Sequence, residues 1–348
     1  MHMADALLSP AVGGTLWVVS GGLLAYSAKK VREEADDRKV PLMGVLGAFI
    51  FAAQMINFTI PATGSSGHLG GGLLLSILLG HYAAFLVLAS ALTVQALFFA
   101  DGGLLALGCN MLNLGFFPCF VAYPFIYKKI AGDSRNRKRV MLGATLAALA
   151  GLQLGAFGVV LQTVASSISS LPFKTFVLLM QPIHLAIGLV EGLVTAGVVS
   201  FMLEARPEIV TAATSRRPIG VSIKGALIAL ATAAAVTGGA LSWLASTHPD
   251  GLEWAMFKTS GKEELESGDG LHRTLAELQG RTAFLPDYGF KRTETATEQG
   301  FAAAAWPAVD KGTSVSGLVG GLFTLLLAGL AGFLFARRKT AAGKPTVN

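Results

Sequence analysis

Eight long apolar stretches alternate with short polar segments, and their lengths predict helices that cross a membrane. The stretches cover residues 10–28, 41–59, 69–99, 103–127, 140–165, 172–203, 219–246 and 313–336. A helix rises about 1.5 Å per residue, so about 20 apolar residues span a bilayer core of ~30 Å. The stretch 69–99 is expected to break at Gly80-His81, leaving 69–80 as a short or re-entrant helix. The pattern therefore predicts nine crossings.

The composition favours a membrane protein over a soluble one. Hydrophobic residues make up 53% of the 348 residues and charged residues 14%, whereas soluble domains carry about 25% charged residues. A soluble fold of this composition would expose too much apolar surface to water. Only Cys109 and Cys119 are present, both in apolar sequence, which excludes a disulfide scaffold. The predicted class is an all-α integral membrane protein.

The positive charges are clustered, and the clusters predict the orientation. Of the 27 Lys and Arg residues, 19 lie in four segments, 29–39, 128–139, 206–224 and 337–344. Basic residues in short loops mark the cytoplasmic face. We therefore expect the C-terminus inside, and the N-terminus and the polar segment 247–312 outside, in the cell inner or plasma membrane. The net charge of +6 does not indicate nucleic-acid binding, because no basic face has interleaved aromatic residues.

The N-terminus begins Met1-His2, which has a specific metal chemistry. It has no basic segment, so we expect no signal peptide, and Met1 is expected to stay because His2 is large. The Met1 amine, the deprotonated His2 amide and His2 Nδ1 can bind one metal in two fused chelate rings. An amine with a pKa of about 8 readily loses its proton to a metal, and such tetragonal nitrogen sites suit Ni(II) and Cu(II). The alternative is that His2 lies in a tail without a ligand role.

His68 is the best candidate for a fourth donor. It lies in the glycine-rich segment 64–72, an outer loop on the same side as the N-terminus. Glycines let backbones approach closely, so this segment is expected to leave room for the tail to insert. The alternative is a loop histidine that binds no metal.

The other histidines have less specific interpretations. His81 is expected to mark the helix break or to bond within the bundle, and His248 and His272 are expected to be solvated. His184 and Glu191 are seven residues apart in an apolar stretch, so they share one helical face. Ionisable residues inside a membrane usually carry function, but a structural pair is an equally good interpretation.

Several catalytic and energy-coupling motifs are missing from the sequence. No P-loop, His-Glu-x-x-His or Gly-x-Ser-x-Gly motif occurs. The chain is therefore expected to bind no ATP and to be no enzyme. Asp101, beside Gly102-Gly103, is expected to cap or turn a helix end.

Seven segments together resemble a known family and an accessory domain. Five of them, residues 1–5, 57–72, 95–103, 106–110 and 184–191, resemble the CbiM/NikM family of substrate-specific components of energy-coupling factor (ECF) transporters for cobalt and nickel. Pro-Asp-Gly-Leu-Glu at 249–253 and Leu-Pro-Asp-Tyr at 285–288 resemble the PDGLE domain, which is similar to the accessory component CbiN/NikN. The sequence thus resembles a fusion of the two.

The resemblance implies a fold and partner subunits. Residues 1–205 would form the ECF substrate-component bundle with an extra N-terminal helix, of about seven spans. Residues 206–348 would form a two-span module around the outer segment 247–312. The implied partners are a CbiQ/NikQ-like transmembrane scaffold and CbiO/NikO-like ATPases.

The resemblance also implies the ligands of a transported Ni²⁺ or Co²⁺ ion. These are the Met1 amine, the His2 amide and imidazole, and the His68 imidazole. Five further residues lie in matching motifs and are candidates for orienting the tail or its ligands: Asp5, Asn57, Asn110, His184 and Glu191.

Two hypotheses from different classes follow. In the first, the chain is the metal-capturing subunit of an ATP-driven uptake system. In the second, it is an accessory or scaffold protein that docks partners through 247–312 and holds no metal. A membrane enzyme built on His184 and Glu191 is disfavoured because the sequence supplies no nucleophile or cofactor motif there. Nickel and cobalt are not distinguished, because low-spin Co(II) also accepts a planar nitrogen site.

Overall fold

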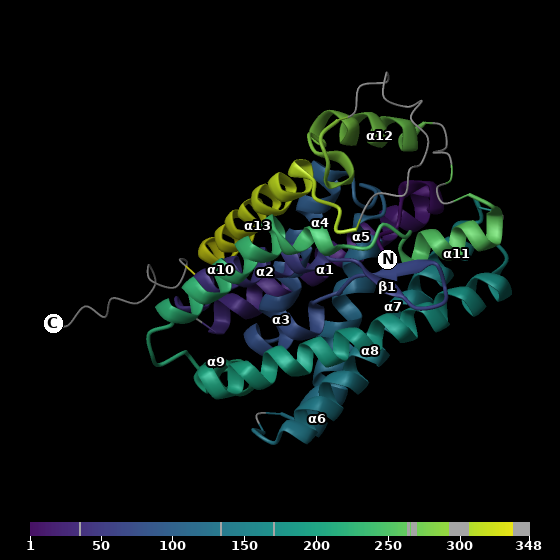
Figure 1. Cartoon of the computed structure of the whole chain (residues 1–348). Coiled ribbons are helices and arrows are strands. Elements are labelled where there is room, and N and C mark those ends of the chain that lie inside the picture. The colour runs from purple at the N-terminus through teal and green to yellow at the C-terminus, as the bar shows by residue number, and fades with distance from the viewer. Residues whose placement is uncertain are drawn as a thin grey trace.

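The chain forms an almost wholly helical bundle (Figure 1). The computed structural model describes residues 1–34, 36–132, 134–169, 171–262, 265, 270–291 and 306–336. The predicted C-terminal basic cluster, 337–344, lies outside the described residues. The prediction of an all-α membrane fold is confirmed, with one addition, a small antiparallel hairpin of β1 (Phe58–Ile60) and β2 (Ser65–Gly67).

The other secondary-structure elements of the described chain are α-helices, short 3-10 helices and one π-helix. Those before residue 206 are η1 (Asp5–Leu7), α1 (Pro10–Glu34), α2 (Lys39–Gln54), α3 (Gly72–Leu79), α4 (His81–Phe99), α7 (Arg137–Ser166) and α8 (Phe173–Ala205). Between α4 and α7 lies a continuous helical rod of α5 (Leu107–Asn110), the wider-turned η2 (Met111–Tyr127) and α6 (Lys128–Ile130). The later elements are α9 (Pro207–Ser215), α10 (Lys224–Gly239), η3 (Leu241–Leu244), α11 (Gly251–Ser260), α12 (Leu271–Thr282), η4 (Pro286–Tyr288) and α13 (Lys311–Ala336).

Six helical segments in the described part of the chain are long and apolar enough to cross a membrane. They are α1, α4, the rod Leu107–Ile130, α7, α8 and α13. Helices α2 and α10 are apolar but have 16 residues each, which corresponds to about 24 Å of helix. Both end earlier than the predicted stretches 41–59 and 219–246, because β1 follows α2 and the short η3 follows α10.

The predicted break inside residues 69–99 is confirmed. Helix α3 ends at Leu79 and α4 begins at His81, and Gly80 between them has φ +80°. Glycine tolerates this left-handed conformation because it has no Cβ. All eight residues of α3 are buried, so the short helix lies inside protein rather than against lipid, as a partial crossing requires.

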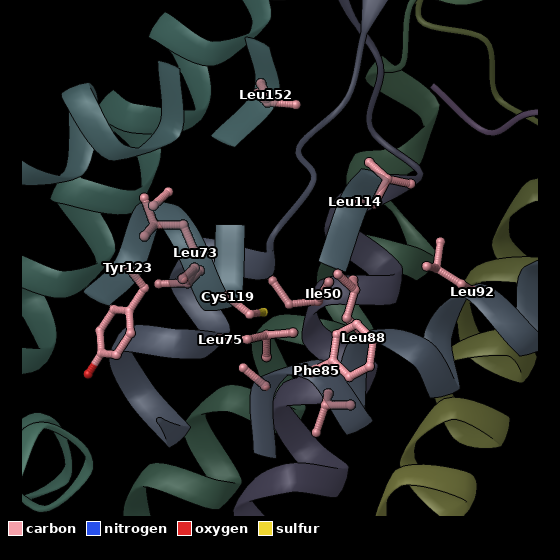
Figure 2. Close-up of a cluster of buried hydrophobic side chains, with 14 of the residues drawn as sticks. Ile50, Leu73, Leu75, Phe85, Leu88, Leu92, Leu114, Cys119, Tyr123 and Leu152 are labelled. Atoms are coloured by element: carbon pink, nitrogen blue, oxygen red, sulfur yellow. The ribbon is translucent and has the colours of Figure 1, made fainter. Parts of the chain in front are cut away.

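Small residues and aliphatic side chains pack the core. Where α7 meets α8, a Cβ added at Gly192 would lie 2.5 Å from the Thr145 Cα, so only glycine permits this close approach. Helix α13 packs on α2 in the same way, with Gly44 against the Leu325 carbonyl oxygen. Figure 2 shows the central cluster, contributed by α2, α3, α4, η2 and α7: Ile50, Leu73, Leu75, Phe85, Leu88, Leu92, Leu114, Cys119, Tyr123 and Leu152.

Three described basic clusters meet at one end of the bundle. The Asp36 carboxylate accepts a hydrogen bond from the Ile219 N–H at 3.0 Å, and the Lys128 ammonium donates to the Thr214 carbonyl at 3.2 Å. The N-terminus, α11 and α12 lie toward the other end (Figure 1). These three basic clusters and the N-terminal tail are thus separated along the bundle axis.

The outer segment is bound to the bundle at this second end. His272 Nε2 donates to the Leu8 carbonyl at 2.7 Å, and Gln279 Nε2 donates to the Ala96 and Gly102 carbonyls at 2.8 and 2.7 Å. The expectation that His272 is solvated is therefore wrong: it is buried on the tail, whereas His248 is exposed as predicted.

Candidate metal centre

The N-terminal tail runs into the bundle rather than over its surface. Met1 is 4% exposed and Met3 is fully buried. The Met3 N–H donates to Asn110 Oδ1 at 2.8 Å, and its carbonyl accepts from Asn110 Nδ2 at 3.2 Å and from the Gly103 N–H at 2.9 Å. Asp5 Oδ1 accepts from the Ala106 N–H at 2.9 Å. These bonds replace the water that the tail backbone loses on burial.

The space that the tail occupies is left by two glycines outside the predicted segment 64–72, Gly102 and Gly103. A Cβ at Gly103 would lie 1.8 Å from Asp5 Oδ1, and one at Gly102 would lie 3.3 Å from the His2 Cβ. The expectation that segment 64–72 provides this space is wrong. Four of its five glycines pack against other helices, as Gly67 does on Ile187 and Gly71 on Ile50, and a Cβ at Gly64 would meet nothing within 4 Å.

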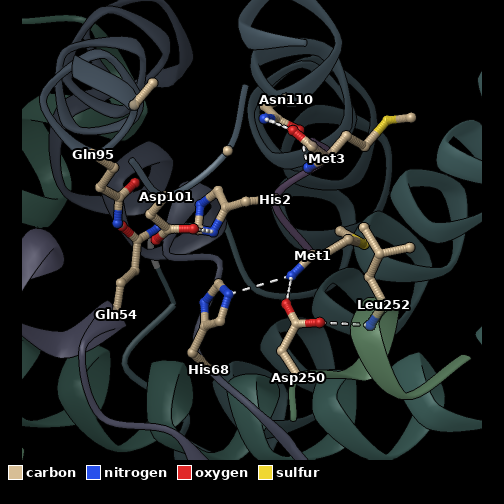
Figure 3. Close-up of polar contacts among 12 residues, drawn as sticks. Met1, His2, Met3, Gln54, His68, Gln95, Asp101, Asn110, Asp250 and Leu252 are labelled. Atoms are coloured by element: carbon tan, nitrogen blue, oxygen red, sulfur yellow. Dashed lines mark hydrogen bonds and ion pairs between the residues drawn. The ribbon is translucent and has the colours of Figure 1, made fainter. Parts of the chain in front are cut away.

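The Met1 amine lies between two side chains from distant parts of the chain (Figure 3). Its nitrogen is 3.4 Å from His68 Nε2 and 2.5 Å from Asp250 Oδ2. His68 comes from the loop after β2, and Asp250 precedes α11 in the outer segment. The structure therefore brings together two of the predicted ligand residues, Met1 and His68, and adds a carboxylate.

His68 presents a free nitrogen lone pair to the amine. Its Nδ1 is 3.1 Å from the Leu69 carbonyl oxygen, which only accepts, so Nδ1 carries the proton and Nε2 does not. Burial first, and then the positive N-terminus and His2, lower the pKa of His68 to about 3. The ring is therefore neutral near pH 7, which is the form that binds metals.

His2 stacks on His68 and contacts Asp101. The two imidazole rings are nearly parallel, at 5°, with centroids 5.1 Å apart. His2 Nδ1 is 3.0 Å from Asp101 Oδ1, while His2 Nε2 is buried without a hydrogen-bond partner among the described residues. Burial raises the pKa of the Asp101 carboxyl, but the charge and hydrogen bond of His2 and the bond from Tyr288 together hold it below its usual value.

Glu191 supports the loop that carries His68. Its carboxylate oxygens accept the Gly70 and Gly71 N–H groups at 2.9 and 3.1 Å, and Gln54 Nε2 donates to the Gly70 carbonyl at 2.9 Å. The loop leaves His68 through Gly71, whose φ of +77° suits glycine. The predicted candidate Glu191 therefore contacts the backbone two residues beyond His68.

The two remaining candidates, His184 and Asn57, lie near the site, and the hydrogen bonds described for them go to residues outside the tail. His184 shares a buried face of α8 with Glu191, but its Nδ1 lies 2.8 Å from the Met180 carbonyl, so the two residues bind different partners. His184 lines a small cavity with Met1, His68 and Asp250. The Asn57 carbonyl accepts from the Ser246 N–H at 2.7 Å, which ties the loop to the outer segment.

A cavity of about 480 Å³ lies between the tail and the outer segment, lined among others by His2, His68, Asp101, Asp250 and Tyr288. Within the described ranges, no three His, Cys, Asp or Glu side chains are placed to hold a metal ion. A metal centre here therefore needs main-chain nitrogens besides the two imidazoles.

Three further residues at the site, Asp101, Asp250 and Tyr288, were not predicted as site residues from the sequence. Asp101 lies just after the end of α4, as predicted, but its carboxylate also contacts His2 and accepts a hydrogen bond from the Tyr288 hydroxyl. The sequence does indicate that Asp250 begins a helix, since Asp250 and Glu253 have the spacing of a capping box. Its contact with Met1 joins residues 249 positions apart, and no local pattern encodes such a contact.

Fold and site together define a multi-pass helical membrane protein with its N-terminal tail buried beside two stacked imidazoles. The family model described as the cobalt uptake substrate-specific transmembrane region, CbiM, matches residues 2–209, and the chain belongs to this family. A model of the PDGLE domain matches residues 224–337. The predicted resemblance to a CbiM/NikM–PDGLE fusion is confirmed.

Individual relatives agree with this assignment. A putative fused nickel transport protein NikMN from Archaeoglobus fulgidus is 36% identical over 234 residues, covering 66% of this chain and 75% of the relative. The cobalt transport protein CbiM from Sorangium cellulosum is 31% identical, covering 60% of this chain and 94% of its own. The crystal structure of a truncated transition metal transporter is 31% identical with a TM-score of 0.52, covering 59% of this chain and 99% of that one.

Proposed function

We propose that this chain is the membrane subunit that captures Ni²⁺ or Co²⁺ from outside the cell for uptake. The metal would be bound by the Met1 amine, the His2 amide nitrogen, His2 Nδ1 and His68 Nε2. The observation that carries the proposal is the 3.4 Å separation of the Met1 nitrogen and the unprotonated His68 Nε2, both buried. The N-terminal amine and the neutral imidazole beside it would supply two of the four nitrogen donors of a planar site.

Metal capture requires one local rearrangement. His2 Nδ1, the nitrogen that closes the second chelate ring, contacts Asp101 at 3.0 Å. Binding would turn the imidazole away from Asp101, toward the Met1 amine and His68. Asp101 would then hold the metal-free tail in place, and losing this contact would be part of the cost of loading.

Transport would need energy from other subunits. The sequence has no P-loop, so ATP hydrolysis is assigned to CbiO/NikO-like ATPases acting through a CbiQ/NikQ-like scaffold, as in an ECF transporter. The gathering of three basic clusters at the end of the bundle away from the tail supports an outward-facing metal site. Residues 1–205 would be the capturing bundle and 206–348 an accessory module.

Metal analysis of the purified chain tests this function. We expect about one equivalent of bound nickel or cobalt per chain, and competition titration between the two metals gives the preference. His68→Ala is expected to weaken binding without unfolding the bundle, because the ring lies at a loop. A well-folded chain that holds no stoichiometric metal would favour the accessory or scaffold function instead.

A further inference from the structure

Asp250 makes the shortest contact to the Met1 amine, although it belongs to the other end of the chain. Its Oδ2 lies 2.5 Å from the Met1 nitrogen, and the Asp250 and Met1 side chains are 15% and 3% exposed. A partly buried carboxylate at this distance from an amine makes a charge-assisted hydrogen bond, among the strongest in proteins.

The orientation of this carboxylate is fixed by the helix that it begins. Asp250 Oδ1 accepts the Leu252 and Glu253 N–H groups at 2.7 and 2.9 Å, and the Asp250 N–H donates to Glu253 Oε2 at 2.9 Å. This reciprocal capping box uses one carboxylate oxygen for the helix. The other oxygen, Oδ2, is thereby directed to the amine.

The start of α11 is in turn bound to the strand that precedes His68. The Ser66 N–H donates to the Pro249 carbonyl at 2.8 Å, and Ser66 Oγ donates to the His248 carbonyl at 2.8 Å. On its other side, a Cβ at Gly251 would lie 2.5 Å from Ile183 Cγ2. The same short strand, β2, therefore fixes the position of the Asp250 carboxylate relative to the His68 ring.

We propose that Asp250 is a positioning residue of the metal centre. Its Oδ2 accepts an N–H of the Met1 amine and holds the amine nitrogen beside His68 Nε2. A metal-bound amine keeps N–H groups, so the hydrogen bond persists after loading and orients the ligand as outer partners of metal ligands do. The inference rests on the proposed function, and it makes the C-terminal module part of the metal centre.

Four variants of the full chain separate this role from the helix cap. Asp250→Ser keeps a good N-cap for α11 but is too short to reach the amine, and Asp250→Asn keeps both shape and cap while losing the charge. Glu253→Ala breaks the capping box but leaves the carboxylate. Lys258→Ala changes an exposed side chain on the same helix α11 and serves as the neutral control.

Nickel affinity is measured by titration, and the absorption spectrum of the bound nickel reports its donor set. Asp250→Ser and Asp250→Asn are expected to lose about 10- to 100-fold in affinity, with the spectrum unchanged at saturating nickel. Glu253→Ala and Lys258→Ala are expected to bind like the unaltered chain.

Two results would overturn the inference alone: unaltered affinity in both Asp250 variants, or an equal loss in Glu253→Ala. The first would show that the carboxylate does not act on the amine, and the second that any disturbance of α11 has the same effect. If the unaltered chain itself binds no nickel or cobalt, the proposed function and this inference fall together.

Discussion

At the scale of single residues, the site keeps the His68 imidazole neutral, with an unprotonated Nε2, inside a buried pocket. His68 is only 9% exposed, and its Nδ1 is used by the Leu69 carbonyl. A buried charged imidazole would be costly without a partner, and the neighbouring amine adds to that cost. The pocket therefore excludes the protonated ring and leaves Nε2 unprotonated, the form that the proposed metal site requires.

A pH dependence follows from the lowered pKa of His68. The folded chain keeps His68 neutral down to about pH 3, whereas the ring in the unfolded chain takes up a proton near pH 6.5. The unfolded state thus binds more protons below pH 6.5, so the stability of the metal-free chain falls as the pH drops from about 6.5 toward 3. His68→Gln, which cannot titrate, should lose less stability over this range. Thermal unfolding of both proteins between pH 4 and 8 measures this, and parallel curves would contradict it.

At the scale of elements, short segments rather than long helices position the site. The loop after β2, the turn at 100–106 and the start of α11 supply contacts to the tail. The long helices provide the walls against which these segments pack. Because the turn approaches the tail so closely, a single methyl group there should affect metal binding without changing the helices.

Gly103→Ala tests this close approach. The new Cβ would lie 1.8 Å from Asp5 Oδ1 and 2.5 Å from the Asp5 nitrogen, so the tail must shift. Overpacking of this kind costs about 1–3 kcal/mol, and here the cost falls on tail docking and hence on metal affinity. Gly14→Ala is the matched control, since a Cβ there meets nothing within 4 Å. Nickel titration should show a loss for the first variant alone, and equal affinities would argue against the docked tail.

The sequence indicated the long helices well because each depends on a local apolar run. The break at Gly80 was also readable, from a glycine and a histidine inside an overlong stretch. The chemistry of a free Met-His terminus pointed to Met1 and His2 without knowledge of the fold. The contacts of Asp101 with His2 and of Asp250 with Met1 were not readable, because they join segments 99 and 249 residues apart. The buried position of His272 has the same origin, since its partner is the Leu8 carbonyl.

At the scale of the whole molecule, the three described basic clusters and the site lie at opposite ends of the bundle. The basic segments around Asp36, Lys128 and Thr214 contact one another at one end. The tail, α11 and α12 meet at the other (Figure 1). If the basic loops face the cytoplasm, the proposed metal site faces the outside of the cell.

Cysteine labelling tests this orientation. Cys109 and Cys119 are fully buried, so an introduced cysteine should dominate the signal. Lys258→Cys on α11 is expected to react with a membrane-impermeant maleimide in intact cells, and Arg135→Cys only after lysis; both positions are exposed. The reverse pattern would place the metal site inside the cell.

The central claim is that the α-amine of Met1 is itself a metal ligand, and one added residue tests it most directly. An alanine placed before Met1 moves the amine and breaks the fused chelate rings, whereas the same residue added after Asn348 leaves them intact. Titration of both proteins with nickel, against the unaltered chain, is the measurement. The account predicts that stoichiometric binding is lost on N-terminal extension and kept on C-terminal extension. Undiminished nickel affinity in the N-terminally extended chain would contradict it.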